Sequence, residues 1–131
     1  EVGALLILDE IQCGLGRTGK WFAFQHFNIV PDILTLAKSF GGGLPIGTFV
    51  SSEERMQLLA RDPMLGHITT FGGNPVCAAA AWATLCALEE EKRIDHVEEK
   101  GQLIESLLRH PDIREIRRKG LLFAIDFDSG D

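Results

Sequence analysis

The sequence predicts an α/β fold, built from a mostly parallel sheet with helices on its faces. Two continuous apolar runs, residues 4–8 and 33–36, are typical of parallel strands that are buried on both faces. Residues 76–89 follow as an alanine-rich helix, and small side chains all round it favour close packing against a sheet. These three segments together indicate strands and a helix that pack as layers.

The N-terminal half is predicted to hold short elements joined by loops. Residues 14–19 form a glycine-containing loop, and the aromatic segment 21–27 has the length of one or two helical turns. A third short strand is expected over residues 46–51. Ser51 or Ser52 is the candidate N-cap of a helix that follows this strand.

The C-terminal half is predicted to hold two helices and two strands. Asn74 is the candidate N-cap of the alanine-rich helix, and Pro75 is its first residue. Apolar residues at spacings of three and four predict a second helix over about residues 94–109. Two strands are then expected over residues 113–118 and 121–127.

A charged run, residues 89–93, marks a change of subdomain in this interpretation. Residue 1 is Glu, it enters a strand-like run almost at once, and the chain also ends close to a strand. Because domains usually begin and end in exposed polar segments, we expect a segment of a longer protein.

Composition narrows the class of protein. The 131 residues are 45% hydrophobic and 24% charged, and the net charge of −6 argues against binding to nucleic acid. No apolar run approaches the ~20 residues that cross a membrane. Cys13, Cys77 and Cys86 form no CxxC pair, which favours reduced thiols in the cytoplasm over a disulfide framework.

Lys38 is the first candidate for chemistry. It follows the apolar stretch 33–37 and precedes a glycine-rich segment, residues 39–47. Apolar surroundings disfavour a charged ammonium, and Schiff-base chemistry requires a lysine with a free amine. Asp9 also follows an apolar strand. Both side chains are therefore expected at carboxyl ends of strands, where open α/β sheets bind ligands.

Pyridoxal phosphate would use these residue types. The cofactor needs a lysine for its aldehyde, an acid partner for its pyridine nitrogen and a donor for its ring oxygen. Asp9 can be the acid, and Gln12 can donate to the ring oxygen. A protonated ring nitrogen beside Asp9 would draw electron density away from the substrate carbon.

Two nucleotide-binding patterns also occur by letter. Residues 14–19 match GxGxxG, but that fingerprint requires a strand directly before it and a helix directly after it. Residues 14–20 match GxxxxGK, but Trp21 stands where a phosphate loop has the Ser or Thr that binds Mg²⁺. Both patterns are weaker interpretations than a lysine-bound cofactor.

The ordered blocks of the chain resemble the class III (subgroup II) aminotransferases, which are pyridoxal-phosphate enzymes of fold type I. The resemblance is strongest from residue 5 to residue 80. It is carried by residues 8–20, His26, residues 31–33, 37–38, 41–47 and 69–75. It implies that residues 1–90 are part of the large cofactor-binding domain and that residues 91–131 begin the small C-terminal α+β domain.

The resemblance implies a role for each candidate residue. Lys38 would hold the cofactor covalently and carry a proton between the substrate carbon and the cofactor. Asp9 would pair with the pyridine nitrogen, and Gln12 would hydrogen-bond the ring oxygen. Thr70 would bind the cofactor phosphate of the neighbouring subunit, which implies a homodimer with a shared active site. No metal site is implied.

The implied activity moves an amino group from an amine or ω-amino acid to a 2-oxo acid. The amino donor would resemble acetylornithine, ornithine or 4-aminobutyrate. The phosphate loop, ring-stacking aromatic and carboxylate-binding arginine of the family do not lie within this chain. Two alternatives therefore stay open, a catalytically inactive fragment and an aminomutase of the glutamate-semialdehyde type.

Overall fold

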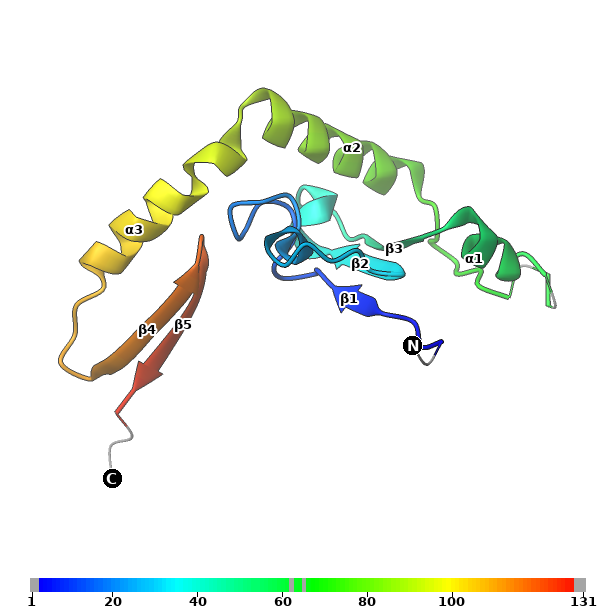
Figure 1. The fold of residues 1–131 in the computed structure, drawn as a ribbon. Coiled ribbons are helices and arrows are strands. Elements are labelled where there is room, and N and C mark those ends of the chain that lie inside the picture. Colours follow the sequence, from blue (N-terminus) through cyan, green and yellow to red (C-terminus); the bar gives the residue numbers. More distant parts are fainter. Residues whose placement is uncertain (1–2, 62, 65, 129–131) are drawn as a thin grey trace.

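The protein has two small sheets beneath an arch of helices (Figure 1). A computed structural model describes residues 3–61, 63–64 and 66–128. Helices α2 (Pro75–Glu90) and α3 (Val97–Leu107) form the two limbs of the arch, joined by the 3₁₀ turn η3 (Arg93–His96). In the described part of the chain, no helix has the length and apolar character needed to cross a membrane.

The first sheet has the strand order β1 (Ile7–Asp9), β2 (Ile33–Ala37), β3 (Gly47–Ser51). Strands β1 and β2 are parallel, and Asp9 lies opposite Thr35. Strand β3 pairs with β2 in the antiparallel sense. The link between β2 and β3, residues 38–46, is shorter than the dozen or more residues that a parallel crossover needs. The α/β fold class is confirmed, with β3 as its antiparallel member.

Strand β1 is more exposed than its apolar sequence predicts. Leu5 is 52% exposed and Ile7 is 56% exposed, whereas Leu34 and Leu36 of β2 are buried. Within the described residues, β1 pairs only with β2, so one edge of β1 has no neighbouring strand. The predicted burial of residues 4–8 on both faces is therefore wrong for this part of the fold.

Local capping residues start the first two helices. Helix α1 (Glu53–Leu58) begins after Ser52, whose Oγ accepts a hydrogen bond from Arg55 N. Helix α2 begins after Asn74, whose Oδ1 accepts hydrogen bonds from the backbone N–H of Val76 at 3.0 Å and Cys77 at 3.3 Å. The predicted cap at Asn74 is confirmed, and Ser52 is the cap of α1.

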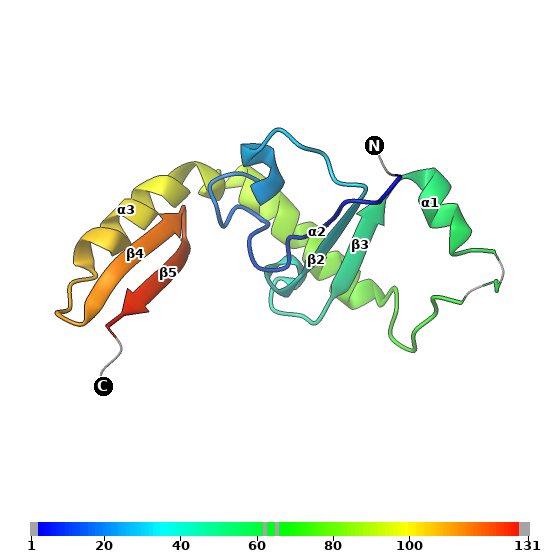
Figure 2. The ribbon, with the colours of Figure 1, turned by 60° about the horizontal axis from the view of Figure 1, so that its bottom comes forward.

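Helix α2 buries one side only. Ala81 is buried, but Trp82 beside it is 69% exposed. The helix lies against the 3₁₀ turn η2 (Lys38–Gly41) that follows β2 (Figure 2). The prediction that α2 is buried tightly against a sheet is therefore wrong for the described residues, because its main neighbour is the turn η2.

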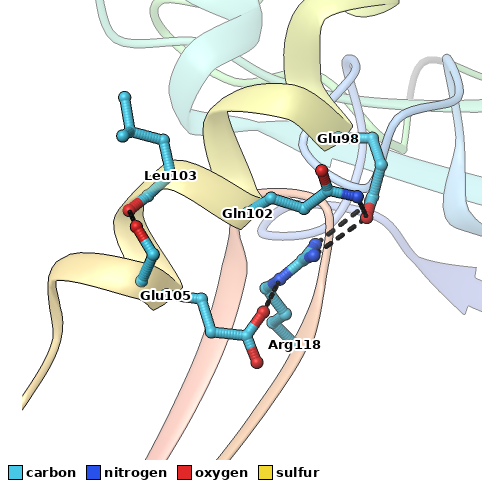
Figure 3. Close-up of polar contacts among 6 residues, drawn as sticks. Glu98, Gln102, Leu103, Glu105 and Arg118 are labelled. Carbon is cyan, nitrogen blue, oxygen red and sulfur yellow. Dashed lines mark hydrogen bonds and ion pairs between the residues drawn. The ribbon is translucent and has the colours of Figure 1, made fainter.

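The C-terminal sheet is a hairpin of β4 (Ile113–Lys119) and β5 (Leu122–Phe127), as predicted. Arg118 ties β4 to α3 (Figure 3). Its Nε donates to Glu105 Oε2 at 2.6 Å, and its Nη atoms donate to both carboxylate oxygens of Glu98 at 2.9 and 3.1 Å. The guanidinium holds the pKa of Glu98 below its usual value. Such charge-assisted, bidentate contacts fix the hairpin on the helix.

The tip of the hairpin docks onto the loop that follows β1. Leu121 N donates to Arg17 O at 2.8 Å. A Cβ on Gly120 would lie 2.7 Å from Thr18 C, and a Cβ on Gly101 of α3 would lie 2.3 Å from Gly120 O. Glycine is required at both positions because backbone meets backbone without room for a side chain.

Candidate active site

Asp9 ends β1 with one carboxylate oxygen held and the other open. Ile11 N donates to Asp9 Oδ1 at 2.9 Å. Within the described residues, Oδ2 has no hydrogen-bond partner, and the side chain is exposed. The turn that follows Asp9 therefore orients its carboxylate, and Oδ2 can accept a hydrogen bond from a protonated nitrogen of a ligand.

Lys38 lies at the matching end of the neighbouring strand. It follows β2 directly and has a left-handed backbone, with φ of +49°. Because β1 and β2 are parallel and Asp9 lies opposite Thr35, Asp9 and Lys38 come from carboxyl ends that lie side by side. The structure thus has the strand-end arrangement that the sequence predicts.

Lys38 borders an open hollow of about 1040 Å³ between η2 and α2. The walls are largely apolar and include Phe40, Phe71 and Trp82. Lys38 itself is exposed, so the expectation that its stem is held in apolar surroundings is met only on the side that faces these walls. The apolar surroundings exist as one wall of the hollow.

A close approach of backbone to helix fixes the turn after Lys38. A Cβ on Gly42 would lie 2.3 Å from Thr84 Oγ1, and φ at Gly42 is +58°. Thr84 Oγ1 in turn donates to Ala80 O at 2.9 Å. Helix α2 therefore sets the position of η2, and with it the position of Lys38.

The other predicted residues, Asp9, Gln12 and Thr70, do not border this hollow. Gln12 is exposed in the turn after Asp9, with its side chain toward solvent. Thr70 is exposed in the segment before Asn74, and its neighbours Thr69 and Phe71 border the hollow, but Thr70 does not. The fold thus places Asp9 and Gln12 on one turn and brings the segment around Thr70 to the side of Lys38.

Glu10 was not among the predicted site residues, but it is the most buried acid described, with 4% exposure. Its Oε2 accepts from Ala23 N at 2.9 Å, and its Oε1 accepts from Phe24 N at 2.9 Å. The Cys13 thiol also lies 3.2 Å from Oε2. The signal in the sequence is an acid directly after the strand-end acid Asp9, followed by a glycine-containing loop.

The Cys13 thiol is a poor nucleophile at neutral pH. Burial is the main cause that raises its pKa to about 11, and the hydrogen bond to Glu10 and the charge of Glu10 add to the shift. Because the thiolate is the reactive form, the raised pKa disfavours reactions of Cys13 at neutral pH.

The two nucleotide-binding patterns do not have the structure that they require. Residues 11–18 are turns, and the next helical element, η1 (Ala23–His26), is a single 3₁₀ turn. Lys20 Nζ donates to Gln25 O at 3.1 Å, as part of this local structure. Neither a dinucleotide-binding βα turn nor a phosphate loop is formed.

A sequence profile of the family "Aminotransferase class-III" matches residues 1–131. The chain belongs to this family. Among solved structures, the class III chain resembles an ornithine aminotransferase from Toxoplasma gondii, with 41% identity and a TM-score of 0.84. The alignment covers 96% of this chain and 30% of that chain.

Two further structures show how broad the similarity is. An ornithine δ-aminotransferase from Plasmodium falciparum is 38% identical, with a TM-score of 0.81, over 95% of this chain and 32% of that chain. An S-selective transaminase from Arthrobacter sp. is 35% identical, with a TM-score of 0.83, over 96% of this chain and 28% of that chain. This class III chain thus spans about a third of the length of the proteins that it matches.

Proposed function

We propose that the protein is a pyridoxal-phosphate-dependent aminotransferase that moves an amino group from an amine or ω-amino acid to a 2-oxo acid. The observation that carries the proposal is the position of Asp9 and Lys38 at adjacent carboxyl ends of two parallel strands. Membership of the class III family supports the same reading. The Toxoplasma gondii relative is described with pyridoxal phosphate at its active site.

The residues present fit this cofactor. Lys38 supplies an exposed amine beside a roomy hollow, and Asp9 supplies an oriented carboxylate with a free oxygen. When bound, the cofactor supplies an electron sink for carbanion chemistry. Lys38 would hold the aldehyde and move a proton at Nζ, and Asp9 would keep the ring nitrogen protonated. Gln12 would orient the ring through its oxygen.

The remaining roles extend beyond one copy of the chain. Thr70 would bind the cofactor phosphate of the neighbouring subunit in a homodimer, and its exposed side chain, which does not border the Lys38 hollow, is compatible with that role. We also assign residues 1–90 to the large domain and residues 91–131 to the small domain, in the cytoplasm. The three free cysteines agree with that compartment.

For the amino donor, we favour an ω-amino acid of the ornithine class. The two ornithine aminotransferases are 41% and 38% identical to the chain, against 35% for the S-selective transaminase. An assay with ornithine, acetylornithine, 4-aminobutyrate and a simple amine as donors, with 2-oxoglutarate as acceptor, ranks these donors by kcat/KM. A preference for the simple amine would contradict this choice of donor.

A cofactor titration tests the proposed function. Pyridoxal phosphate added to the complete protein should produce an absorbance band at about 410–430 nm that reports its attachment to a lysine. Lys38→Ala should abolish the band. Lys100→Ala, an exposed lysine of α3, is the matched control and should leave the band unchanged. A protein without the band would support the inactive alternative instead.

A further inference from the structure

We propose that Glu10 is a positioning residue that holds Asp9 and Gln12 toward the cofactor ring. The proposal rests on the proposed function, because it concerns the same site. Glu10 lies between these two residues in sequence but cannot touch a ligand, since it is only 4% exposed. Its effect on the reaction must therefore pass through the backbone on either side of it.

Both ends of Glu10 are anchored. Its backbone N–H donates to Thr35 O at 3.0 Å, which extends the pairing of β1 with β2 by one residue. Its carboxylate spans the N–H groups of Ala23 and Phe24, each at 2.9 Å, at the start of η1. Glu10 thus fixes the end of β1 to strand β2 on one side and to η1 on the other.

The anchored residue begins the turn that orients Asp9. Gly14 N donates to Glu10 O at 2.9 Å, which closes the turn that contains Ile11 and Gln12. Ile11 N in that turn holds Asp9 Oδ1 at 2.9 Å. If Glu10 shifts, the donor that aims the Asp9 carboxylate shifts with it, and so does the backbone of Gln12.

The contacts require an acid and would not suit an amide. The groups of Ala23, Phe24 and Cys13 that face the carboxylate are all donors, and they occupy both of its oxygens. A glutamine would turn its NH₂ group toward at least one of these donors. A buried donor without an acceptor is destabilising, so the turn would have to move.

Glu10→Gln in the complete protein is the first test, with Glu90→Gln at an exposed position of α2 as the matched control. The readouts are the dissociation constant of pyridoxal phosphate and the pH midpoint at which the visible band of the bound cofactor changes. We expect Glu10→Gln to weaken binding by about tenfold, the scale of one lost hydrogen bond to a charged group. We expect the midpoint to move by about half a pH unit or more, because the charge that faces the ring nitrogen is displaced.

Ala23→Pro is a second variant, which leaves Glu10 in place. It removes the N–H that faces Oε2, and the proline ring displaces the carboxylate. Proline is tolerated at the first position of a helical turn. Phe22 before it has φ of −133° and ψ of 143°, the extended conformation that a residue before proline adopts. Ala23→Pro should move both readouts in the same direction as Glu10→Gln.

The outcomes test the role of Glu10 separately from the proposed function. Weaker binding and a moved midpoint in either variant, with Glu90→Gln unchanged, supports the positioning role. If Glu10→Gln does not fold, Ala23→Pro alone decides. Unchanged binding and an unchanged midpoint in the folded variants would overturn the role of Glu10 and leave the proposed function intact. A wild-type protein without the band would overturn both.

Discussion

Replacing Gly101 by alanine should destabilise the protein, although the same change usually stabilises a helix. Gly101 lies within α3, where alanine is favoured over glycine by about 1 kcal/mol. The new Cβ would lie 2.3 Å from Gly120 O. An ordinary contact between these atom types is about 3.3 Å or longer, so the hairpin must retreat by roughly 1 Å.

The retreat has a calculable cost. It would disturb the 2.8 Å hydrogen bond from Leu121 N to Arg17 O, and the loss of this bond costs about 1 kcal/mol. Overpacking of a fitted contact adds about 1–3 kcal/mol. After the gain in helix propensity, the net loss of unfolding free energy for Gly101→Ala should be about 2 kcal/mol.

Urea denaturation followed by circular dichroism measures this loss. Gly47→Ala is the matched control, because a Cβ on Gly47 meets nothing within 4 Å. The control should stay within about 0.5 kcal/mol of wild type. A Gly101→Ala protein that is as stable as wild type would refute the reasoning, because it would show that the hairpin does not press on α3.

Three further predictions concern single side chains. In a variant with Cys13 as its only cysteine, the rate of alkylation by iodoacetamide should rise with pH around a midpoint of about 11, the pKa of the thiol. Glu10→Gln should lower this midpoint, because it removes the charge that raises the pKa. Glu98 has a lowered pKa, so its contribution to stability is present above about pH 4.5 and is lost as pH falls through the lowered pKa. Glu98→Gln should therefore flatten the acid side of a stability-versus-pH curve, which Glu99→Gln should not do. Asn74→Ala should lower the free energy of thermal unfolding by about 1 kcal/mol, because the first turn of α2 loses its side-chain acceptor. Asn74→Asp keeps an acceptor at this position and should have the stability of the wild-type protein.

Elements that depend on local chemistry could be predicted from the sequence. Asn74 and Pro75 mark the start of α2, because the Asn74 side chain accepts hydrogen bonds from backbone N–H groups of the first turn, only a few residues away. The choice between Ser51 and Ser52 needed the structure. Ser51 Oγ donates to Asp32 O at 2.7 Å, so only Ser52 remains to cap α1.

Properties that depend on distant partners could not be predicted. The apolar run around Ile7 has the pattern of a buried strand, but its exposure is set by which strands lie beside it. The exposure of Lys38 depends in the same way on the position of α2. The partners of Arg118 are Glu98 and Glu105 of α3, and no spacing in the sequence of β4 predicts these ion pairs. For the candidate site, the strand-end placement of Asp9 and Lys38 was predictable, whereas the buried contacts of Glu10 were not.

The left-handed backbone at Lys38 has a consequence for protein engineering. A residue other than glycine in this conformation loses about 1–2 kcal/mol relative to a relaxed backbone. Glycine is the replacement that removes this strain, so a screen for thermostability alone would select Lys38→Gly. The selected variant would have a more stable fold but would lack the amine that we propose to bind the cofactor. Lys38 should therefore be held fixed in any stabilising redesign of this protein.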